Sequence, residues 1–118
     1  MSEDKNDVIK HDWGYELVWG PQQNCAGKIL VFEKQDGKTS MHFHSVTEKT
    51  WFVNSGEFSL RFMDTEKAAV YERQLQEGDV YNVKPLQPVQ LICKKAGGSI
   101  TEVSDSNDPY KDIFHIGA

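Results

Sequence analysis

The chain is a succession of short extended runs that turn residues interrupt roughly every six to twelve positions. The runs that predict strands are 13–19, 28–34, 39–44, 50–53, 57–63, 68–74, 80–83, 89–93 and 99–103. A loop is expected at 20–24, and a tight turn at Asn54-Ser55-Gly56 predicts that the strands on either side form a hairpin. The segment 67–76 also permits a helix, although Val70 and Tyr71 favour a strand at least as well. So many short strands predict an all-β sandwich or barrel.

Length and composition point to a single globular domain. The 118 residues suffice for one core, and 38% hydrophobic with 26% charged residues is typical of a folded chain. Residues 1–10 are polar and show no periodicity, so we expect a flexible N-terminus followed by one domain over 11–118.

Charge and hydropathy exclude several classes of partner. The net charge is −5 and the sequence holds no basic stripe, so nucleic acid is not expected as a partner. No apolar run approaches the length of a membrane span, and the segment 1–10 lacks the apolar middle of a signal peptide. A cytoplasmic location is therefore expected, with Cys25 and Cys93 as reduced thiols.

Two of the four histidines, His42 and His44, lie two positions apart in a predicted strand. Side chains alternate between the faces of a strand, so both imidazoles are expected on one face, close enough to hold one ion. Glu48 follows with a carboxylate. Imidazole and carboxylate ligands suit a divalent metal ion, whether zinc, nickel, iron or manganese. His11 and His115 are isolated in the sequence, and surface positions are expected for both.

The order of these residues resembles the two sequence motifs of the cupin family, G-x5-H-x-H-x3/4-E-x6-G and G-x5-P-x-G-x2-H. The matching positions are Gly37, His42, His44, Glu48 and Gly56, then Gly78, Pro85 and Gln90. The flanks of this region, HDWGYE at 11–16, EKTWFVNSGE at 48–57 and Glu102-Val103-Ser104, are similar to the cupin domain of type II phosphomannose isomerases. This resemblance covers roughly residues 12 to 105. It implies a jelly-roll barrel that holds a metal on His42, His44, Glu48 and Gln90.

Two departures from the motif leave the metal site open. Gln90 stands where the family has a histidine, and an amide oxygen is a weaker ligand than an imidazole. Relatives of the isomerase type place the glutamate five positions after the second histidine, where this chain has Lys49 and Glu48 lies one residue early. A bulge or loop between His44 and Thr50 could absorb that slip. The alternatives are a metal site, a weakened metal site, and a metal-free pocket in which Lys49 faces inward and pairs with a phosphate or carboxylate.

The resemblance implies a barrel that binds a sugar or sugar phosphate, with activity similar to mannose-6-phosphate isomerase. The metal would act as the Lewis acid, and Glu48 or a neutral Lys49 would move the proton. The alternative is a non-catalytic ligand-binding module with a degenerate metal site, and a metal-dependent dioxygenase ranks last because the chain offers two imidazoles. We also expect a homodimer that pairs through an N-terminal strand containing Trp13 and Tyr15.

Overall fold

A computed structural model describes residues 7–19, 25–106 and 109–116. The elements are β1 (Asp7–His11), β2 (Gly14–Val18), β3 (Ala26–Phe32), β4 (Met41–Phe43), β5 (Lys49–Ser55), β6 (Glu57–Asp64), β7 (Ala69–Gln76), β8 (Val80–Val83), β9 (Val89–Cys93), β10 (Gly98–Ser104), the 3₁₀ turn η2 (Pro109–Asp112) and β11 (Phe114–Ile116). The loop expected at 20–24 lies outside the described residues.

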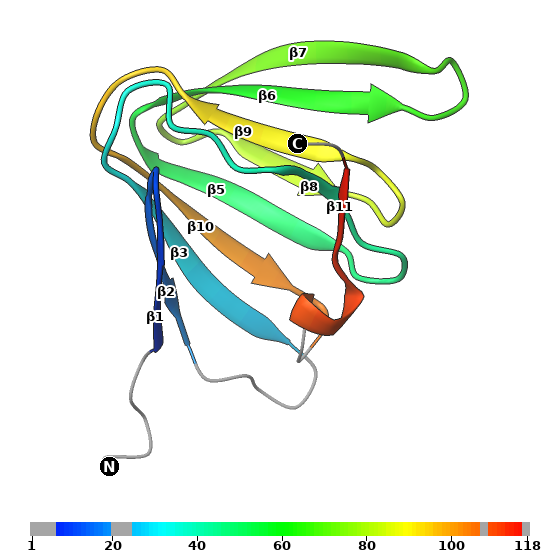
Figure 1. The fold of residues 1–118 in the computed structure, drawn as a ribbon, viewed down its shortest axis with the longest axis horizontal. Coiled ribbons are helices and arrows are strands. Elements are labelled where there is room, and N and C mark those ends of the chain that lie inside the picture. The colour runs from blue at the N-terminus through cyan, green and yellow to red at the C-terminus, as the bar shows by residue number, and fades with distance from the viewer. Residues whose placement is uncertain (1–6, 20–24, 107–108, 117–118) are drawn as a thin grey trace.

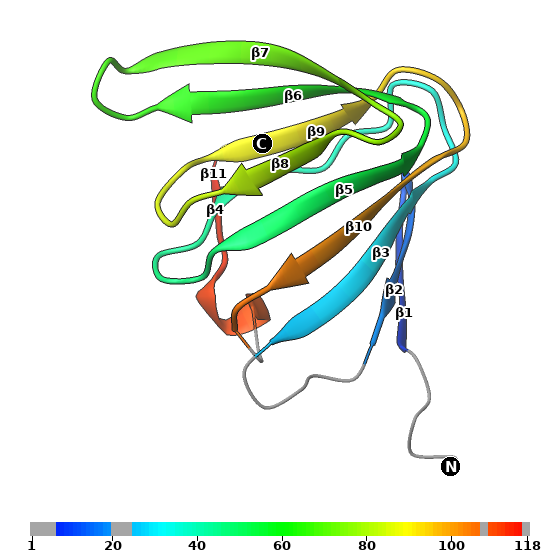
Figure 2. The same cartoon turned by 180° about the vertical axis from the view of Figure 1, so that it is seen from behind.

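Two antiparallel sheets build the domain, as Figures 1 and 2 show from opposite sides. One sheet has the order β1-β2-β3-β10-β5-β8, and the other has the order β11-β4-β9-β6-β7. Neighbours in both sheets are often distant in sequence, as in the pairing of β3 with β10. The prediction of an all-β sandwich or barrel is confirmed, and 67–76 contains strand β7 rather than a helix. Among the described residues, no helix has the length and apolar character needed to cross a membrane.

The hairpin predicted around Asn54-Ser55-Gly56 is wrong, because the strands on either side belong to different sheets. β5 pairs with β10 and β8, whereas β6 pairs with β7 and β9. Gly56 has a φ of 94°, and a Cβ at this position would lie 2.8 Å from the Cα of Gly98. The turn therefore needs glycine twice over, for its backbone angle and for the close approach of another strand, and it carries the chain from one sheet to the other.

Both ends of the described chain form strands that the sequence pattern did not predict. β1 lies largely within the stretch 1–10 that was expected to be flexible, and all five of its residues are exposed. It pairs with β2 as the edge strand of the larger sheet. β11 has only three residues and pairs with β4 at the edge of the smaller sheet. Because β1 is exposed along its whole length and β11 is very short, neither shows the apolar periodicity that predicts a strand.

The apolar core lies between the sheets and contains one cluster of side chains. Its members are Trp13, Leu30, Phe32, Trp51, Val53, Phe58, Leu60, Leu75, Val83, Val89, Leu91, Cys93 and Ile100. Phe58 and Phe32 meet edge to face with ring centroids 5.0 Å apart. A Cβ on Gly98 would lie 2.7 Å from the Phe58 ring, so this end of the interior has no spare room.

The other end of the interior is polar although it lies on the same strand faces. Lys28 is in phase with Leu30 and Phe32 on β3, and Lys49 is in phase with Trp51 and Val53 on β5. Glu102 continues the face of Ile100 on β10. Because alternate residues of a strand share a face, these three ionic side chains point into the barrel.

Substitution of Phe58 by alanine tests the packing of the apolar end. Phe58 is fully buried, so Phe58→Ala should lower the free energy of unfolding by about 3–5 kcal/mol. Phe52→Ala is the matched control, because this phenylalanine on β5 is 43% exposed and should lose under about 1 kcal/mol. Urea denaturation followed by tryptophan fluorescence measures both. Equal losses at the two positions would contradict this description of the core.

Candidate functional site

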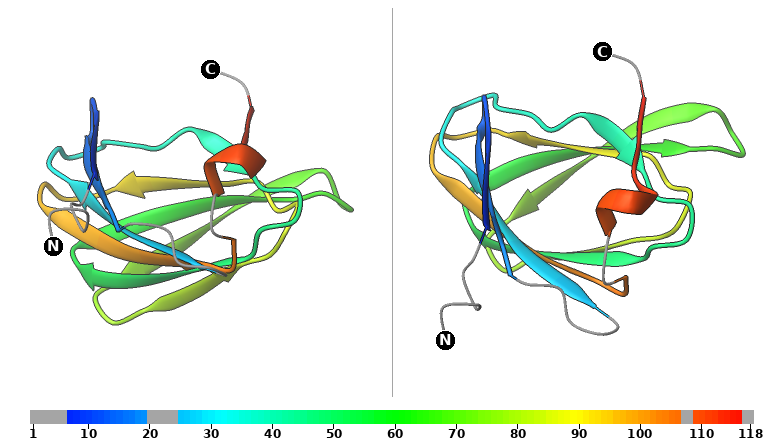
Figure 3. Two further views of the ribbon diagram at one scale, coloured as in Figure 1. Left: turned by 90° about the horizontal axis from the view of Figure 1, so that it is seen from below. Right: turned by 60° about the horizontal axis from the view of Figure 1, so that its bottom comes forward.

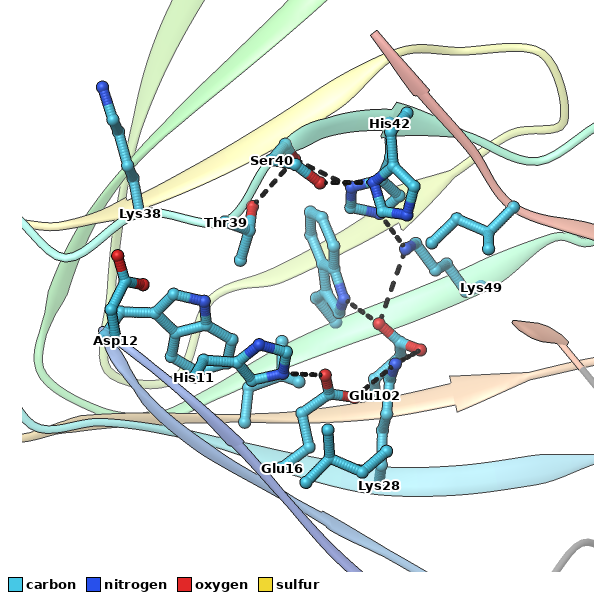
Figure 4. A pocket seen from close by; sticks show the side chains of 16 residues that line it. His11, Asp12, Glu16, Lys28, Lys38, Thr39, Ser40, His42, Lys49 and Glu102 are labelled. Carbon is cyan, nitrogen blue, oxygen red and sulfur yellow. Dashed lines mark hydrogen bonds and ion pairs between the residues drawn. The ribbon is translucent and has the colours of Figure 1, made fainter. Parts of the chain in front are cut away.

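A cavity of about 530 Å³ occupies the polar end of the barrel. Residues of two segments from opposite ends of the chain line it, and Figure 3 shows these segments, β1 and the stretch that ends in β11, apart from each other. Ile9 and His11 of β1 line one side, and Ile113 and His115 line the other. The deeper wall is made of strand residues that carry charge, as Figure 4 shows. Such a volume is typical of pockets for small molecules, which span about 300–1,000 Å³.

His42 and His44 come from the single short strand β4 and the residue just after it. Their residues are 7% and 4% exposed, and the two ring centroids lie 5.7 Å apart with an interplanar angle of 89°. Alternation along the strand therefore brings both imidazoles into the interior on one wall.

The ammonium group of Lys49 lies between the two imidazoles. Its Nζ is 2.8 Å from Nε2 of His42 and 3.3 Å from Nε2 of His44. The same nitrogen is 3.5 Å from Oε1 of Glu102 and lies over the Trp51 ring, 4.8 Å from its centroid. The Lys49 residue is 3% exposed, so almost all of its contacts are with the protein.

The hydrogen-bond partners assign the donors and acceptors around Lys49. Nδ1 of His42 lies 3.0 Å from the carbonyl oxygen of Ser40, and a carbonyl can only accept, so Nδ1 carries the proton. Nε2 of His42 is then an acceptor, and it receives a hydrogen bond from Lys49. Two imidazole nitrogens and one carboxylate oxygen surround Nζ, which matches the three N–H groups of an ammonium ion.

A chain of ionic groups runs from Lys49 to the mouth of the pocket. Glu102 accepts a hydrogen bond from Nε1 of Trp51 at 2.7 Å and forms a 3.5 Å ion pair with Lys28. Lys28 in turn donates to Glu16 at 2.8 Å, and Glu16 lies 2.5 Å from Nε2 of His11. Two lysines and two glutamates therefore alternate along the wall, and their formal charges balance.

Burial and the neighbouring charges shift the pKa values in this wall. Burial, and after it the positive charge of Lys49, lowers the pKa of His42 to about 3, and the same two causes lower the pKa of His44. Burial lowers the pKa of Lys49, and the Glu102 carboxylate opposes that shift. Burial raises the pKa of Glu102, but Lys28, Lys49 and Trp51 together hold it well below its usual range. Both histidines are thus neutral hydrogen-bond acceptors at neutral pH.

The structure does not place Glu48, which was predicted as a metal ligand and a catalytic residue, with the histidines. The Glu48 side chain is 38% exposed and pairs with Lys84 at 3.1 Å on the surface. The carboxylate of Asp105 accepts a hydrogen bond from the backbone N–H of Glu48, and the backbone N–H of Asp105 donates to the carbonyl oxygen of Glu48. This anchored backbone turns Glu48 outward, and the next residue, Lys49, faces inward.

Gln90 also lies away from the histidines, contrary to its predicted role as a metal ligand. His42 pairs with Val89 in the sheet, so Val89 shares the interior face and Gln90 points to the opposite face of β9. There its amide donates to the carbonyl oxygen of Thr39 at 2.8 Å and accepts a hydrogen bond from Arg61 at 3.3 Å. The register of β4 against β9 therefore separates the fourth motif position from the site.

The residues at the histidines do not fit a metal ion in this arrangement. Within the described ranges, no group of three histidine, cysteine, aspartate or glutamate side chains is gathered as metal ligands. The positive charge of Lys49 occupies the space that an ion shared by the two Nε2 atoms would need. A second positive charge there would be repelled strongly in a buried setting.

Five residues of the pocket had no predicted role in a site. Lys28 was predicted only as the first residue of a strand, Glu16 and Glu102 only as strand residues and parts of the family resemblance, and His11 and His115 as isolated surface residues. His115 is exposed, yet its Nδ1 bonds to Oγ of Ser40 at 2.7 Å and its ring lies 6.3 Å from that of His42. One signal in the sequence could have identified the ionic residues of the strands. They lie an even number of positions from apolar core residues on the same strand, which predicts that they face the interior.

Comparison with known proteins identifies the architecture. No family model matches the chain, and no curated protein sequence matches it. Solved structures do match. Oxalate decarboxylase from Bacillus subtilis is 16% identical over 94% of this chain and 30% of its own, with a TM-score of 0.81. The capsular polysaccharide assembling protein CapF from Staphylococcus aureus is 14% identical over 100% of this chain and 35% of its own, with a TM-score of 0.80.

The chain has the cupin fold. An oxalate oxidase shares it at 14% identity and a TM-score of 0.70, over 79% of this chain and 46% of that protein. The chain thus spans about a third of the length of CapF and oxalate decarboxylase and less than half of the oxidase. At these identities the likeness concerns the fold. The prediction of a cupin jelly-roll from the motif residues is confirmed.

The carboxylate of Asp112 holds the loop that sets the orientation of Lys49. It accepts hydrogen bonds from the backbone N–H groups of Ser45, Val46 and Thr47, and from the hydroxyl of Ser45. These bonds, that of the Ser45 hydroxyl first among them, hold the pKa of Asp112 well below its usual value of 3.8, although burial acts in the opposite direction.

Asp112→Ala should lower the free energy of unfolding at pH 7 by about 1–2 kcal/mol, because several hydrogen bonds to one charged acceptor are lost. Asp112→Asn should lose less, since an oxygen acceptor remains. A carboxylate whose pKa is lower in the folded than in the unfolded state stabilises the fold above its unfolded-state pKa. The difference in the free energy of unfolding between wild type and Asp112→Ala should therefore be complete above about pH 5 and shrink as the pH falls through about 4. Urea denaturation across this range measures it. A difference in the free energy of unfolding that grows on acidification would contradict this role of the Asp112 carboxylate.

Proposed function

We propose that this chain binds a sugar or a sugar phosphate in the barrel pocket, and that its reactive part consists of Lys49 and His42, which line the pocket, together with His44, which contacts Lys49. The observation that supports this most directly is the wall of balanced ionic groups around a cavity of about 530 Å³. A polyhydroxylated ligand offers donors and acceptors in similar numbers. Such a ligand suits a wall in which carboxylates alternate with ammonium groups.

Side chains of other kinds support the same ligand class. Trp13 and Trp51 line the cavity and add apolar area beside its charged groups, which suits a sugar ring that has both polar and apolar surface. The backbone and side-chain oxygens of Thr39 and Ser40 lie at the same pocket, beside His42. The fold match to CapF, a capsular polysaccharide assembling protein, is consistent with a carbohydrate ligand.

Aldose–ketose isomerisation is the activity that this chemistry favours. The reaction needs a base for the proton next to the carbonyl and a positive group that holds the developing oxyanion. A neutral imidazole can take the proton, and the Lys49 ammonium can donate to the oxygen. Glu48 has no part in this proposal, because its side chain lies outside the barrel.

Binding without catalysis is the second candidate, and one observation favours it. The Nε2 atoms of His42 and His44 already accept hydrogen bonds from Lys49, so neither imidazole has a free lone pair for a proton of the ligand. Turnover requires Lys49 to leave one imidazole when the ligand binds. A module that only binds its ligand does not require this movement of Lys49.

Calorimetric titration with mannose 6-phosphate, mannose and oxalate tests the ligand class. We expect mannose 6-phosphate or mannose to bind, and oxalate to bind at least ~10-fold more weakly, because a small dianion uses few of the groups in the wall. A coupled assay of fructose 6-phosphate formation then separates the two candidates. Binding with turnover supports the isomerase, and binding alone supports the module.

Lys49→Met should reduce sugar affinity at least ~10-fold, the loss of about one charge-assisted hydrogen bond. Lys84→Met is the matched control, because this lysine pairs with Glu48 on the outside and should leave affinity unchanged. Oxalate binding more tightly than either sugar would contradict the proposal.

The homodimer predicted from the sequence belongs to the same proposal. β1 is the edge strand of the larger sheet, and its five exposed residues leave one edge available for pairing. Trp13 does not contribute to such a surface, because it is 5% exposed within the core. Light scattering after size exclusion at micromolar concentration should give twice the monomer mass of 13.5 kDa.

A further inference from the structure

We propose that the Lys49 ammonium is the resident cation of this pocket and replaces a metal ion at the two histidines, so that the protein binds its ligand without metal. The inference rests on the contacts of Lys49 and not on the identity of the sugar. It also implies that one substitution at position 49 converts the pocket into a metal site.

The position of Nζ supports this inference first. Among the described residues, it is the group that contacts the Nε2 atoms of both His42 and His44, at 2.8 Å and 3.3 Å. These are hydrogen-bond lengths, and a metal ion on the same two nitrogens would lie about 2.0–2.1 Å from each. The cation and a metal would therefore compete for one place. Figure 4 shows the end of the Lys49 side chain beside the His42 ring.

Glu102 and Trp51 also contact the Lys49 ammonium and stabilise its positive charge. Glu102 supplies a carboxylate oxygen at 3.5 Å, and the centroid of the Trp51 ring lies 4.8 Å from the charge. Glu102 is fixed by the Trp51 indole and by Lys28, so its charge is already positioned. Two imidazoles, one carboxylate and one aromatic face stabilise a positive charge in a buried site.

The reach of the side chain explains why Lys49 and a metal-ligating carboxylate are interchangeable here. In a Lys49→Glu variant, the shorter side chain would end before the point that Nζ occupies. A metal ion bound at about 2.0–2.2 Å from its carboxylate oxygen would then stand near that point. The new carboxylate and the imidazoles of His42 and His44 would give that ion three ligands. Because position 49 already faces inward, the substitution needs no change of register.

The test is a titration of metal-free protein with Co²⁺ and Zn²⁺, followed by calorimetry and by the visible absorption of bound cobalt. Wild-type protein should show no one-to-one binding that depends on His42. Lys49→Glu should bind both ions at least ~100-fold more tightly than wild type, since it removes a positive charge and adds a negative one within a few ångströms.

Three further variants make the assignment specific. Lys49→Met removes the charge without adding a carboxylate and should bind metal more weakly than Lys49→Glu. The double variant Lys49→Glu/His44→Ala should lose the gained binding. Glu48→Gln in the Lys49→Glu background should leave it unchanged, because Glu48 lies outside the barrel.

Two results would overturn the proposal. One is one-to-one metal binding by wild-type protein that is lost in a His42→Ala variant with the wild-type circular dichroism spectrum. The other is a Lys49→Glu protein that keeps the wild-type circular dichroism spectrum and thermal transition yet binds no metal. Neither outcome bears on sugar binding, which the titrations with mannose 6-phosphate address separately.

Discussion

The buried positive charge of Lys49 is the constraint on which the polar end of the barrel depends. An ammonium ion removed from water must be compensated by acceptors, and its partners are interior side chains from other segments of the chain. His42 and His44 come from the region of β4 and Glu102 comes from β10, so the contacts of Lys49 on β5 join the two sheets. The apolar core closes one end of the barrel, and this ionic group orders the other.

The ionic wall is a poor way to stabilise a protein, which favours a role in ligand binding. Replacing buried ion pairs with apolar side chains of similar size is often neutral or stabilising. Leu30 and Ile100 show that the same strand faces accept apolar residues one step further along. Breaks in the local pattern of this kind are expected where a site is built. The loss of one partner alone would leave an uncompensated charge, so the wall is retained or replaced as a set.

Strand alternation made most of the fold predictable from the sequence. The bounds of β8 and β9 agree with the predicted runs, and the alternation of Phe58 and Leu60 placed both in the core. β1 and β11 were missed because β1 is exposed along its whole length and β11 has only three residues, so neither shows an apolar face in the sequence. The hairpin at Gly56 was wrong because pairing between sheets depends on partners far along the chain, such as β10 for β5. Local turn residues do not encode those partners.

The same distinction between local patterns and contacts distant in sequence applies to the site. The common face of His42 and His44 follows from alternation, a local property. The choice between Glu48 and Lys49 does not, because contacts with the distant C-terminal part of the chain fix the loop before β5. The carboxylate of Asp105 accepts a hydrogen bond from the backbone N–H of Glu48. The carboxylate of Asp112 accepts hydrogen bonds from the three backbone N–H groups that precede Glu48 in the chain. A shift of one residue in that loop would exchange a lysine for a carboxylate in the barrel interior.

The C-terminal segment therefore acts on the pocket in two ways. Its Asp112 clamps the loop that orients Lys49, while Ile113 and His115, just beyond, line the mouth of the cavity. Few buried contacts hold this segment, since Phe114 and His115 are exposed and β11 pairs with β4 over three residues. Segments with few buried contacts open at low free-energy cost. One short stretch of chain therefore both lines the pocket and holds the loop that sets the orientation of Lys49.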